Sequence, residues 1–191
     1  MDKKTFRKIC IKKVKSNRNV NRYKLDKELN NKLYMLIKNQ KAKTIMLYIP
    51  LAIEVNIVSL IFRLRKEKKT LLVPFMEGES FSLVKYRLPL RKKQYGVKEP
   101  KNTNKYKYKI DLAIVPVIGT DKTLRRVGFG KGFYDRFFEK NHKRIHKILF
   151  VGREYCVSSK IITDDHDVKG NIYLTHRSCD QKEYLKRKLK I

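Results

Sequence analysis

The sequence predicts an α/β fold in which one sheet lies between layers of helices. Two observations carry this prediction: short apolar runs of strand length recur along the chain, and segments with apolar residues at helical spacing lie between them. At 191 residues, of which 41% are hydrophobic, the chain is long enough to bury a substantial core. It contains no internal repeat and no low-complexity linker, so we expect one domain over residues 1–191.

The first part of the chain alternates between helix and strand. Apolar residues at helical spacing predict helices through Phe6–Val14, Leu25–Leu36 and Val55–Leu64. Thr44–Ile49 and Thr70–Val73 are short apolar runs, each closed by a proline, which is typical of buried strands.

The second part predicts further strands separated by longer connections. Glu77–Ser80 is typical of a hairpin turn, after which Phe81–Tyr86 returns as a strand. Residues Arg87–Lys109 lack a period, so we expect a long excursion over the surface. The remaining expected elements are strands at Ile110–Val115, Ile145–Val151 and Asn171–Leu174 and a short helix at Tyr134–Phe138.

The net charge of +30 indicates affinity for polyanions, since lysines and arginines displace counterions from phosphate backbones. Tyrosines alternate with lysines in Lys105–Lys109, a pattern that would allow bases to stack. The basic residues are nevertheless spread along the whole chain, which is typical of a solvated surface around an ordinary core. A basic nucleic-acid-binding protein without turnover is therefore the alternative function, and otherwise we expect only non-specific contact with nucleic acid.

From the sequence we expect neither a membrane span nor a secretion signal. The longest apolar run, Ile45–Val55, includes Pro50 and Glu54 and is shorter than the ~20 residues that a membrane helix requires. The basic N-terminus continues into more lysines, and three widely spaced cysteines indicate reduced thiols. We expect a cytoplasmic monomer with no membrane partner.

The segment after Pro116 carries the clearest chemical signal. It contains an arginine, three alternating glycines and a lysine: Arg126, Gly128, Gly130, Lys131 and Gly132. Alternating glycines let a backbone point N–H groups at an anion, and the helix that follows adds its positive end. The segment matches neither the Walker motif nor the dinucleotide fingerprint, whose sixth position is Phe133 here. It predicts a polyphosphate site, with a plain strand-to-helix connection as the alternative.

Asp135, in the first turn of the helix after this segment, is a candidate ligand for Mg²⁺. Mg²⁺ commonly binds through one or two carboxylates together with substrate phosphates, although an acidic residue also stabilises a helix N-terminus by itself. A second acidic cluster, Asp164–Asp167, is by itself typical of a solvated turn, and its His166 of a surface-loop histidine.

Taken together, these residues resemble the 5-formyltetrahydrofolate cyclo-ligase family. The family signature, Pro-x-x-Ala-Phe-Asp-x-x-Gly-x-Arg-Leu-Gly-x-Gly-x-Gly-Tyr-Tyr-Asp-Arg, matches residues Pro116–Arg136 in its arginine, in its three alternating glycines and in Tyr134-Asp135-Arg136. Other matches in chain order are Lys3 and Arg7, Glu54, Gly96–Pro100 and His166-Asp167, so the resemblance spans nearly the whole chain. The departures are Thr120 for a Phe, Leu124 for a Gly, Phe133 for a Tyr and Cys156 near the position of a Gln.

The resemblance implies an enzyme that converts 5-formyltetrahydrofolate to 5,10-methenyltetrahydrofolate with ATP and Mg²⁺ and releases ADP and phosphate. The reaction would pass through a phosphorylated formyl group, an iminium-phosphate. The family's fold is similar to that of sugar isomerases and CoA transferases: a three-layer α/β/α sandwich with a mainly parallel, mixed sheet.

The resemblance also implies the site residues. Those for ATP are Lys3, Arg7, Arg126, Gly128, Gly130, Lys131, Gly132, Phe133 and Tyr134, with Arg126 and Lys131 catalytic. Those for the folate are Glu54, Phe81, Phe133 and Tyr134. The implied Mg²⁺ ligands are Asp135 and Asp167.

Overall fold

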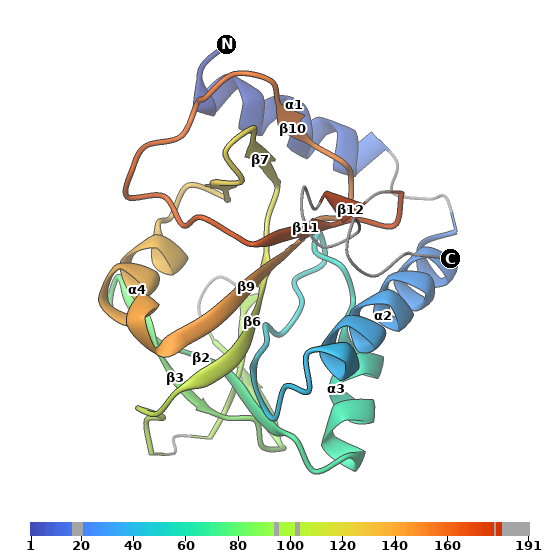
Figure 1. Cartoon of the computed structure of the whole chain (residues 1–191), viewed down its shortest axis with the longest axis vertical. Helices are drawn as coiled ribbons and strands as arrows, with labels where there is room; N and C mark the ends of the chain where they lie inside the picture. The colour runs from blue at the N-terminus through green and yellow to red at the C-terminus, as the bar shows by residue number, and fades with distance from the viewer. Residues whose placement is uncertain (17–20, 94–95, 102–103, 178, 181–191) are drawn as a thin grey trace.

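A central sheet of seven strands organises the molecule (Figure 1). The computed structural model describes residues 1–16, 21–93, 96–101, 104–177 and 179–180. The sheet order is β12-β11-β9-β6-β1-β2-β3. The strands are β1 (Thr44–Met46), β2 (Thr70–Glu77), β3 (Ser80–Lys85), β6 (Ile110–Pro116), β9 (Ile145–Val151), β11 (Ile172–Leu174) and β12 (Cys179–Asp180). The five inner strands are parallel and the two edge strands antiparallel, which confirms the expected mixed, mainly parallel sheet.

The two faces of this sheet bury different side chains, because successive residues of a strand point to opposite faces. Ile45 and Leu71 belong to the core formed with α2 (Arg22–Asn39) and α3 (Val58–Lys66). Their neighbours, Met46 and Leu72, belong to the core formed with α4 (Phe133–Asn141). In Figure 1, α2 and α3 lie on one side of the sheet and α4 on the other, which confirms the three layers.

A third and smaller core holds α1 (Lys3–Ser16) against a second sheet of order β10-β7-β8. The strands of this sheet are β7 (Gly119–Asp121), β8 (Arg126–Val127) and β10 (Val157–Ser158). Phe6 and Cys10 of α1 pack with Val127 and Cys156, and both cysteines are free thiols. Strands of two or three residues are too short to show a period, so this sheet was not predicted. It fixes α1 beside the segment that follows β8.

Several predicted element boundaries need correction. β2 runs through Pro74 to Glu77 and pairs with β3 over this stretch, so the proline does not end the strand. α3 begins at Val58, so Val55 lies before the helix even though it belongs to the same core. β1 ends at Met46, although the Leu47 N–H still donates to the Leu72 carbonyl oxygen at 2.8 Å. The differences at α3 and β1 arise because apolar residues beside an element stay buried although they lie outside its regular hydrogen-bonding pattern.

The expectation that Arg87–Lys109 is only a surface excursion was wrong. It contains a hairpin of β4 (Leu90–Lys92) and β5 (Lys98–Pro100), and Glu99 is buried. The Glu99 carboxylate accepts a hydrogen bond from the Met76 N–H at 3.0 Å, which ties the hairpin to β2. Residues 94–95 and 102–103 of this excursion lie outside the described residues.

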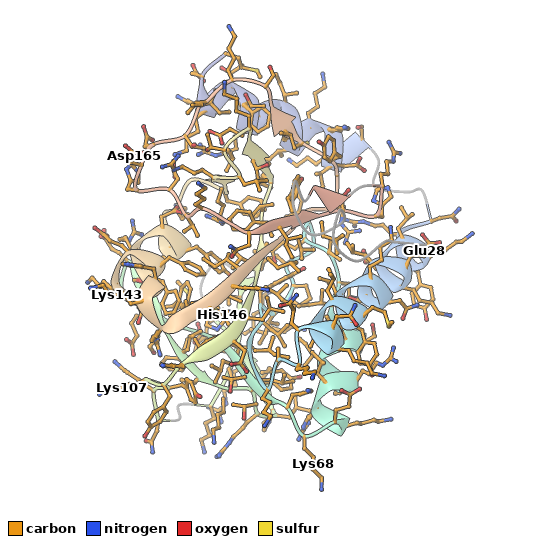
Figure 2. All side chains as sticks on the ribbon, in the orientation of Figure 1. Glu28, Lys68, Lys107, Lys143, His146 and Asp165 are labelled. Carbon is orange, nitrogen blue, oxygen red and sulfur yellow. The ribbon has the colours of Figure 1, made fainter. Side chains whose placement is uncertain are left out.

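The charged side chains project from separate parts of the surface. Figure 2 shows Lys68, Lys107 and Lys143 pointing outward at different places on the outline of the molecule. A short 3-10 helix, His142–Arg144, precedes β9. Among the described helices, none combines the length and the apolar character that a membrane crossing requires.

Candidate active site

Residues 128–132, here called the glycine loop, connect β8 to α4 and separate two cavities. One, of about 340 Å³, is the charged cavity; the other, of about 230 Å³, is the apolar cavity. Arg126, Gly130 and Gly132 line both. The loop follows β8, and β7 and β8 connect it to the carboxyl end of β6. Open α/β sheets place their ligands at the carboxyl ends of their strands.

The conformation of the glycine loop requires its glycines. Gly130 and Gly132 have φ angles of 93° and 68°, in the region that residues with a side chain rarely adopt. A β-carbon at Gly128 would lie 2.4 Å from the Arg126 guanidinium, closer than real contacts allow. The loop can therefore approach two arginine side chains, Arg126 and Arg7, because it carries no β-carbons at these positions.

The charged cavity is lined by cations that come from distant parts of the sequence. Lys3 and Arg7 reach it from α1, and the Arg7 Nε donates to the Gly128 carbonyl oxygen at 2.6 Å. The Arg126 side chain is buried, donates through Nε to the Pro116 carbonyl oxygen at 3.2 Å and lies 3.6 Å from the Asp135 carboxylate. These charges suit a polyphosphate.

The acidic turn at Asp164–Asp167 completes the charged cavity. Asp167 is buried and forms an ion pair with Lys3, and its carboxylate accepts a hydrogen bond from the Asp164 N–H at 2.8 Å. The interpretation of this segment as a plain solvated turn was therefore wrong at Asp167, because the lysine of α1 covers it. Asp165, labelled in Figure 2, does stay fully exposed. The neighbouring turn residue His166 is exposed as well, although it lines the charged cavity.

The residues beside this cavity fit a magnesium ion. Asp135 and Asp167 line it together, and Asp164, His166 and Asp167 each place one ligand atom within 4.8 Å of the others. Carboxylate oxygens next to a phosphate cradle are the donor set that Mg²⁺ uses when it also binds substrate phosphates. Asp164 was not among the expected ligands, since only the late His-Asp pair had matched the family pattern.

The apolar cavity is walled by aromatic rings. Phe81 lies edge-on to Tyr134 with ring centroids 5.1 Å apart and stacks on Phe137 at 4.4 Å. The Arg126 guanidinium lies 4.8 Å from the centroid of the Tyr134 ring, so the residue shared by the two cavities also touches this wall. Tyr48 and Met76 add to the lining without having been predicted from the sequence.

Glu54 is the one acidic side chain among the described residues that line the apolar cavity. Burial raises the pKa of Glu54 to about 7, although a hydrogen bond from the Leu51 N–H and the charge of Arg126 favour the ionised form. That hydrogen bond joins the Leu51 N–H to the Glu54 Oε2 at 2.9 Å. Burial also raises the pKa of Tyr134, so its hydroxyl stays protonated. The cavity thus offers one titratable acceptor within a largely apolar wall.

The predicted site residues divide between the two cavities. Lys3, Arg7, Gly128, Asp135 and Asp167 line the charged cavity, as expected for a nucleotide and its metal. Glu54, Phe81, Phe133 and Tyr134 line the apolar cavity, as expected for a folate. Lys131, Phe133 and Tyr134 were also predicted to contact the nucleotide; all three line the apolar cavity and not the charged one, and their contact with the nucleotide stays a prediction.

Two positions of the signature hold the loop before Arg126. Asp121 is fully buried and accepts hydrogen bonds from the Thr123 and Thr163 hydroxyls. Burial opposes its ionisation, but these hydrogen bonds outweigh burial and lower the pKa of Asp121 to about 2. Leu124, at the position where the family has a glycine, keeps a φ of 59°. The loop therefore retains a left-handed turn there and strains a leucine to do so.

Thr120, which stands where the family signature has a phenylalanine, leaves the backbone pairing unchanged. This side chain is completely buried, and its hydroxyl oxygen has no hydrogen-bond partner among the described residues. Its backbone N–H donates to the Cys156 carbonyl oxygen at 2.9 Å, so the strand pairing of β7 with β10 persists. Cys156 itself packs in the core under α1 rather than in either cavity.

Comparisons with known proteins identify relatives of this chain. A model of the 5-formyltetrahydrofolate cyclo-ligase family matches residues 1–176. A 5-formyltetrahydrofolate cyclo-ligase from Mycoplasma genitalium is 27% identical over 86% of this chain and 92% of its own length. Another from Haemophilus influenzae is 26% identical over 82% of this chain and 88% of its own.

Two solved structures share the fold. The NMR structure of Aquifex aeolicus 5,10-methenyltetrahydrofolate synthetase, 29% identical, covers 96% of this chain and 94% of that one with a TM-score of 0.77. A 5,10-methenyltetrahydrofolate synthetase from Mycoplasma pneumoniae, 24% identical, covers 92% and 99% with a TM-score of 0.73 and supports the fold alone. Because the family model spans most of its length, this chain belongs to the 5-formyltetrahydrofolate cyclo-ligase family, a family of enzymes.

Proposed function

We propose that the protein uses ATP and Mg²⁺ to cyclise 5-formyltetrahydrofolate to 5,10-methenyltetrahydrofolate, with release of ADP and phosphate. The observation that carries the proposal is the arrangement of the two cavities. A charged one and an aromatic one share the glycine loop as a wall, and the buried Arg126 lines both. Such an arrangement suits the transfer of a phosphoryl group from a nucleotide to a flat, largely apolar acceptor.

The charged cavity is the proposed site of the triphosphate. Lys3, Arg7 and Arg126 would neutralise its charge, and the positive end of α4 faces the same space through Gly132. Phosphoryl transfer depends mainly on position and on charge neutralisation, and this cavity offers fixed cations for both.

The apolar cavity is the proposed site of the pterin ring. Phe81 and Tyr134 provide the aromatic wall, and Glu54 would accept hydrogen bonds from ring N–H groups when it is ionised. A ring held against this wall would present its formyl oxygen to the shared residue Arg126.

The chemistry of the substrates explains why both cavities are needed. A formamide oxygen is a poor leaving group, so N10 cannot expel it unaided. When the formyl oxygen attacks the γ-phosphorus, ADP leaves and the formyl carbon becomes an iminium-phosphate. N10 then attacks that carbon and loses its proton, and the carbon–oxygen bond breaks with departure of phosphate. Arg126 would neutralise charge on the transferred group throughout.

Asp135 and Asp167 are the proposed holders of Mg²⁺, with Asp164 and His166 adjacent. These carboxylates would hold an ion whose positive charge helps to neutralise the substrate phosphates. Without ligand, Asp167 pairs with Lys3 and Asp135 lies near Arg126. The triphosphate would therefore replace these carboxylates as the partner of Lys3 and Arg126, and the metal ion would replace the two cations as the partner of the carboxylates.

The test is turnover of 5-formyltetrahydrofolate with Mg-ATP, followed through the near-ultraviolet absorbance of the methenyl product. We expect product only when ATP, Mg²⁺ and the intact protein are all present. The Asp135→Asn variant should fold and lose turnover by orders of magnitude. A folded wild-type sample that binds ATP but forms no product would contradict the proposal and indicate another amide substrate. One that binds neither ligand would favour the basic nucleic-acid-binding alternative.

A further inference from the structure

We propose that Arg136 is a positioning residue that holds the glycine loop in the conformation both cavities require. The inference rests on the proposed function, because it concerns the wall between the two ligands. Arg136 lies in the first turn of α4 and ends the signature motif, yet the reaction described above gives it no role.

The Arg136 guanidinium joins three segments of the chain. Its Nε donates to the carbonyl oxygen of Glu79, in the turn between β2 and β3, at 2.6 Å. Its Nη2 donates to the carbonyl oxygen of Lys131, in the glycine loop, at 2.7 Å. A planar guanidinium has donors in a rigid fork, so it can satisfy two carbonyls whose directions differ.

The same side chain packs directly on the loop. A β-carbon at Gly132 would lie 2.6 Å from the Arg136 Nη1, and the φ of Gly132 is +68°. On the next residue, the Phe133 ring centroid lies 5.6 Å from the guanidinium carbon. The left-handed glycine and the close guanidinium therefore depend on each other: the glycine makes room, and the arginine fixes the carbonyl that precedes it.

These contacts connect two segments that contribute to the lining of the apolar cavity. Phe81, one aromatic wall, follows the Glu79 turn by two residues on β3. Lys131 and Phe133, which also line the apolar cavity, flank the glycine that Arg136 touches, and Gly132 also lines the charged cavity. Loss of the fork would let the loop shift relative to the hairpin and would disturb both ligands together.

A direct contact between the charge of Arg136 and phosphate is the competing explanation, because Arg136 also lines the charged cavity. A lysine at this position would keep the charge but has one nitrogen in place of the two, Nε and Nη2, that donate to the two carbonyls. Arg136→Lys therefore separates the two explanations. If the two guanidinium donors are required, Arg136→Lys should lose nearly as much activity as Arg136→Gln. If only the positive charge is required, Arg136→Lys should keep the activity of the wild type.

Arg144 provides a matched control. Its Nη1 donates to the carbonyl oxygens of Tyr106 and Tyr108 at 2.8 and 3.3 Å, and its Nε to Asn141 Oδ1 at 2.9 Å. It thus makes the same kind of bridge, but it lines neither cavity. Arg144→Gln should report the general cost of losing such a bridge.

The experiment compares Arg136→Lys, Arg136→Gln and Arg144→Gln by steady-state kinetics and by amide hydrogen exchange, after thermal melting has shown that each is folded. We expect both Arg136 variants to lose about 10²-fold in kcat/KM for both substrates, the size of effect that a misplaced reacting group produces. Amides of residues 128–133 should exchange faster in both Arg136 variants, while Arg144→Gln should match the wild type in kinetics and in loop exchange.

Two results would overturn the inference: wild-type kinetics in Arg136→Lys, or unchanged exchange of residues 128–133 in Arg136→Gln. The exchange measurement needs no turnover. If the wild type fails to form the methenyl product, the proposed function falls while the exchange data still decide whether Arg136 holds the loop.

Discussion

The charged cavity and the apolar cavity share a wall, but they are built in different ways. The charged cavity gathers side chains from both ends of the sequence: Lys3 and Arg7 from α1, and Asp167 from the turn before β11. The apolar cavity extends the core of the sheet, because Phe81 belongs both to its lining and to the core under α4. The charged site therefore depends on how α1 is docked, whereas the aromatic site depends on the sheet itself. Substitutions should accordingly affect one ligand, the other, or both, according to which cavity they touch.

The largest effect is expected where the cavities meet. Arg126→Gln removes a buried charge that lines both, so turnover should fall by about 10²- to 10³-fold, the usual cost of losing a group that stabilises transition-state charge. The measurement is kcat with both substrates saturating. The neighbouring Arg125, which pairs with the exposed Asp165 at 2.8 Å and lines neither cavity, provides the control Arg125→Gln. A folded Arg126→Gln enzyme with turnover within a few-fold of the wild type would contradict the assignment.

A substitution that touches only the charged cavity should weaken the binding of the nucleotide and not that of the folate. Lys3→Gln should raise the KM for ATP about tenfold, since a hydrogen bond to a charged group contributes ~1.5–3 kcal/mol. The KM for 5-formyltetrahydrofolate should stay unchanged. Lys4→Gln, one residue along α1 and exposed, is the control for the change in net charge. A rise in the folate KM equal to that for ATP would mean that the two cavities do not separate the ligands.

A substitution that touches only the apolar cavity should weaken the binding of the folate and not that of ATP. Phe81→Leu keeps most of the volume but removes the edge-on contact with Tyr134, so the KM for the folate should rise about fivefold, within the range that an aromatic pair contributes. The KM for ATP should not change. Phe138→Leu, buried in the same core but outside the cavity lining, tests whether lost packing alone explains the result. Equal kinetic losses in the two variants would remove Phe81 from the folate site.

The sequence predicted the charged site better than the apolar one, and the reasons are physical. Glycine spacing and charge are local signals, so the loop around Arg126 could be located without a structure, while its phosphate chemistry stays a prediction. The sequence did not reveal that Lys131 lines the apolar cavity rather than the charged one, because its spacing in the motif does not say which side of the loop its side chain faces, and its contact with the nucleotide stays a prediction. Tyr48 and Met76 carry no motif and reach the apolar cavity only when β1 and β2 pair.

Residues that act through the backbone were the hardest to find. The Asp121 carboxylate accepts hydrogen bonds from backbone N–H groups of two separate loops. The Arg136 guanidinium donates hydrogen bonds to backbone carbonyl oxygens of the glycine loop and of a hairpin turn. No spacing in the sequence encodes such contacts. The layered fold, in contrast, was predictable, since strands covered on both faces have continuous apolar runs.

The smallest expected effect is a pH dependence of stability and of kcat/KM for the folate that arises from Glu54 in the apolar cavity. The pKa of Glu54 is raised from its ordinary value of 4.5 to about 7, so the folded protein binds an extra proton between these values. Stability should therefore fall as pH rises through this window, while kcat/KM for the folate should rise toward pH 7 as the carboxylate forms. Both slopes should weaken in Glu54→Gln, measured by melting temperature and by initial rates. Unaltered slopes in the variant would assign them to another group.

The most direct test of the two-cavity account is a crystal structure of the protein with a non-hydrolysable ATP analogue, Mg²⁺ and 5-formyltetrahydrofolate. The account predicts phosphates between Lys3, Arg7 and Arg126, and a pterin ring against Phe81 with Glu54 at its edge. The formyl oxygen should face the γ-phosphate across Arg126. A pterin ring in the charged cavity, or phosphates away from the glycine loop, would contradict it.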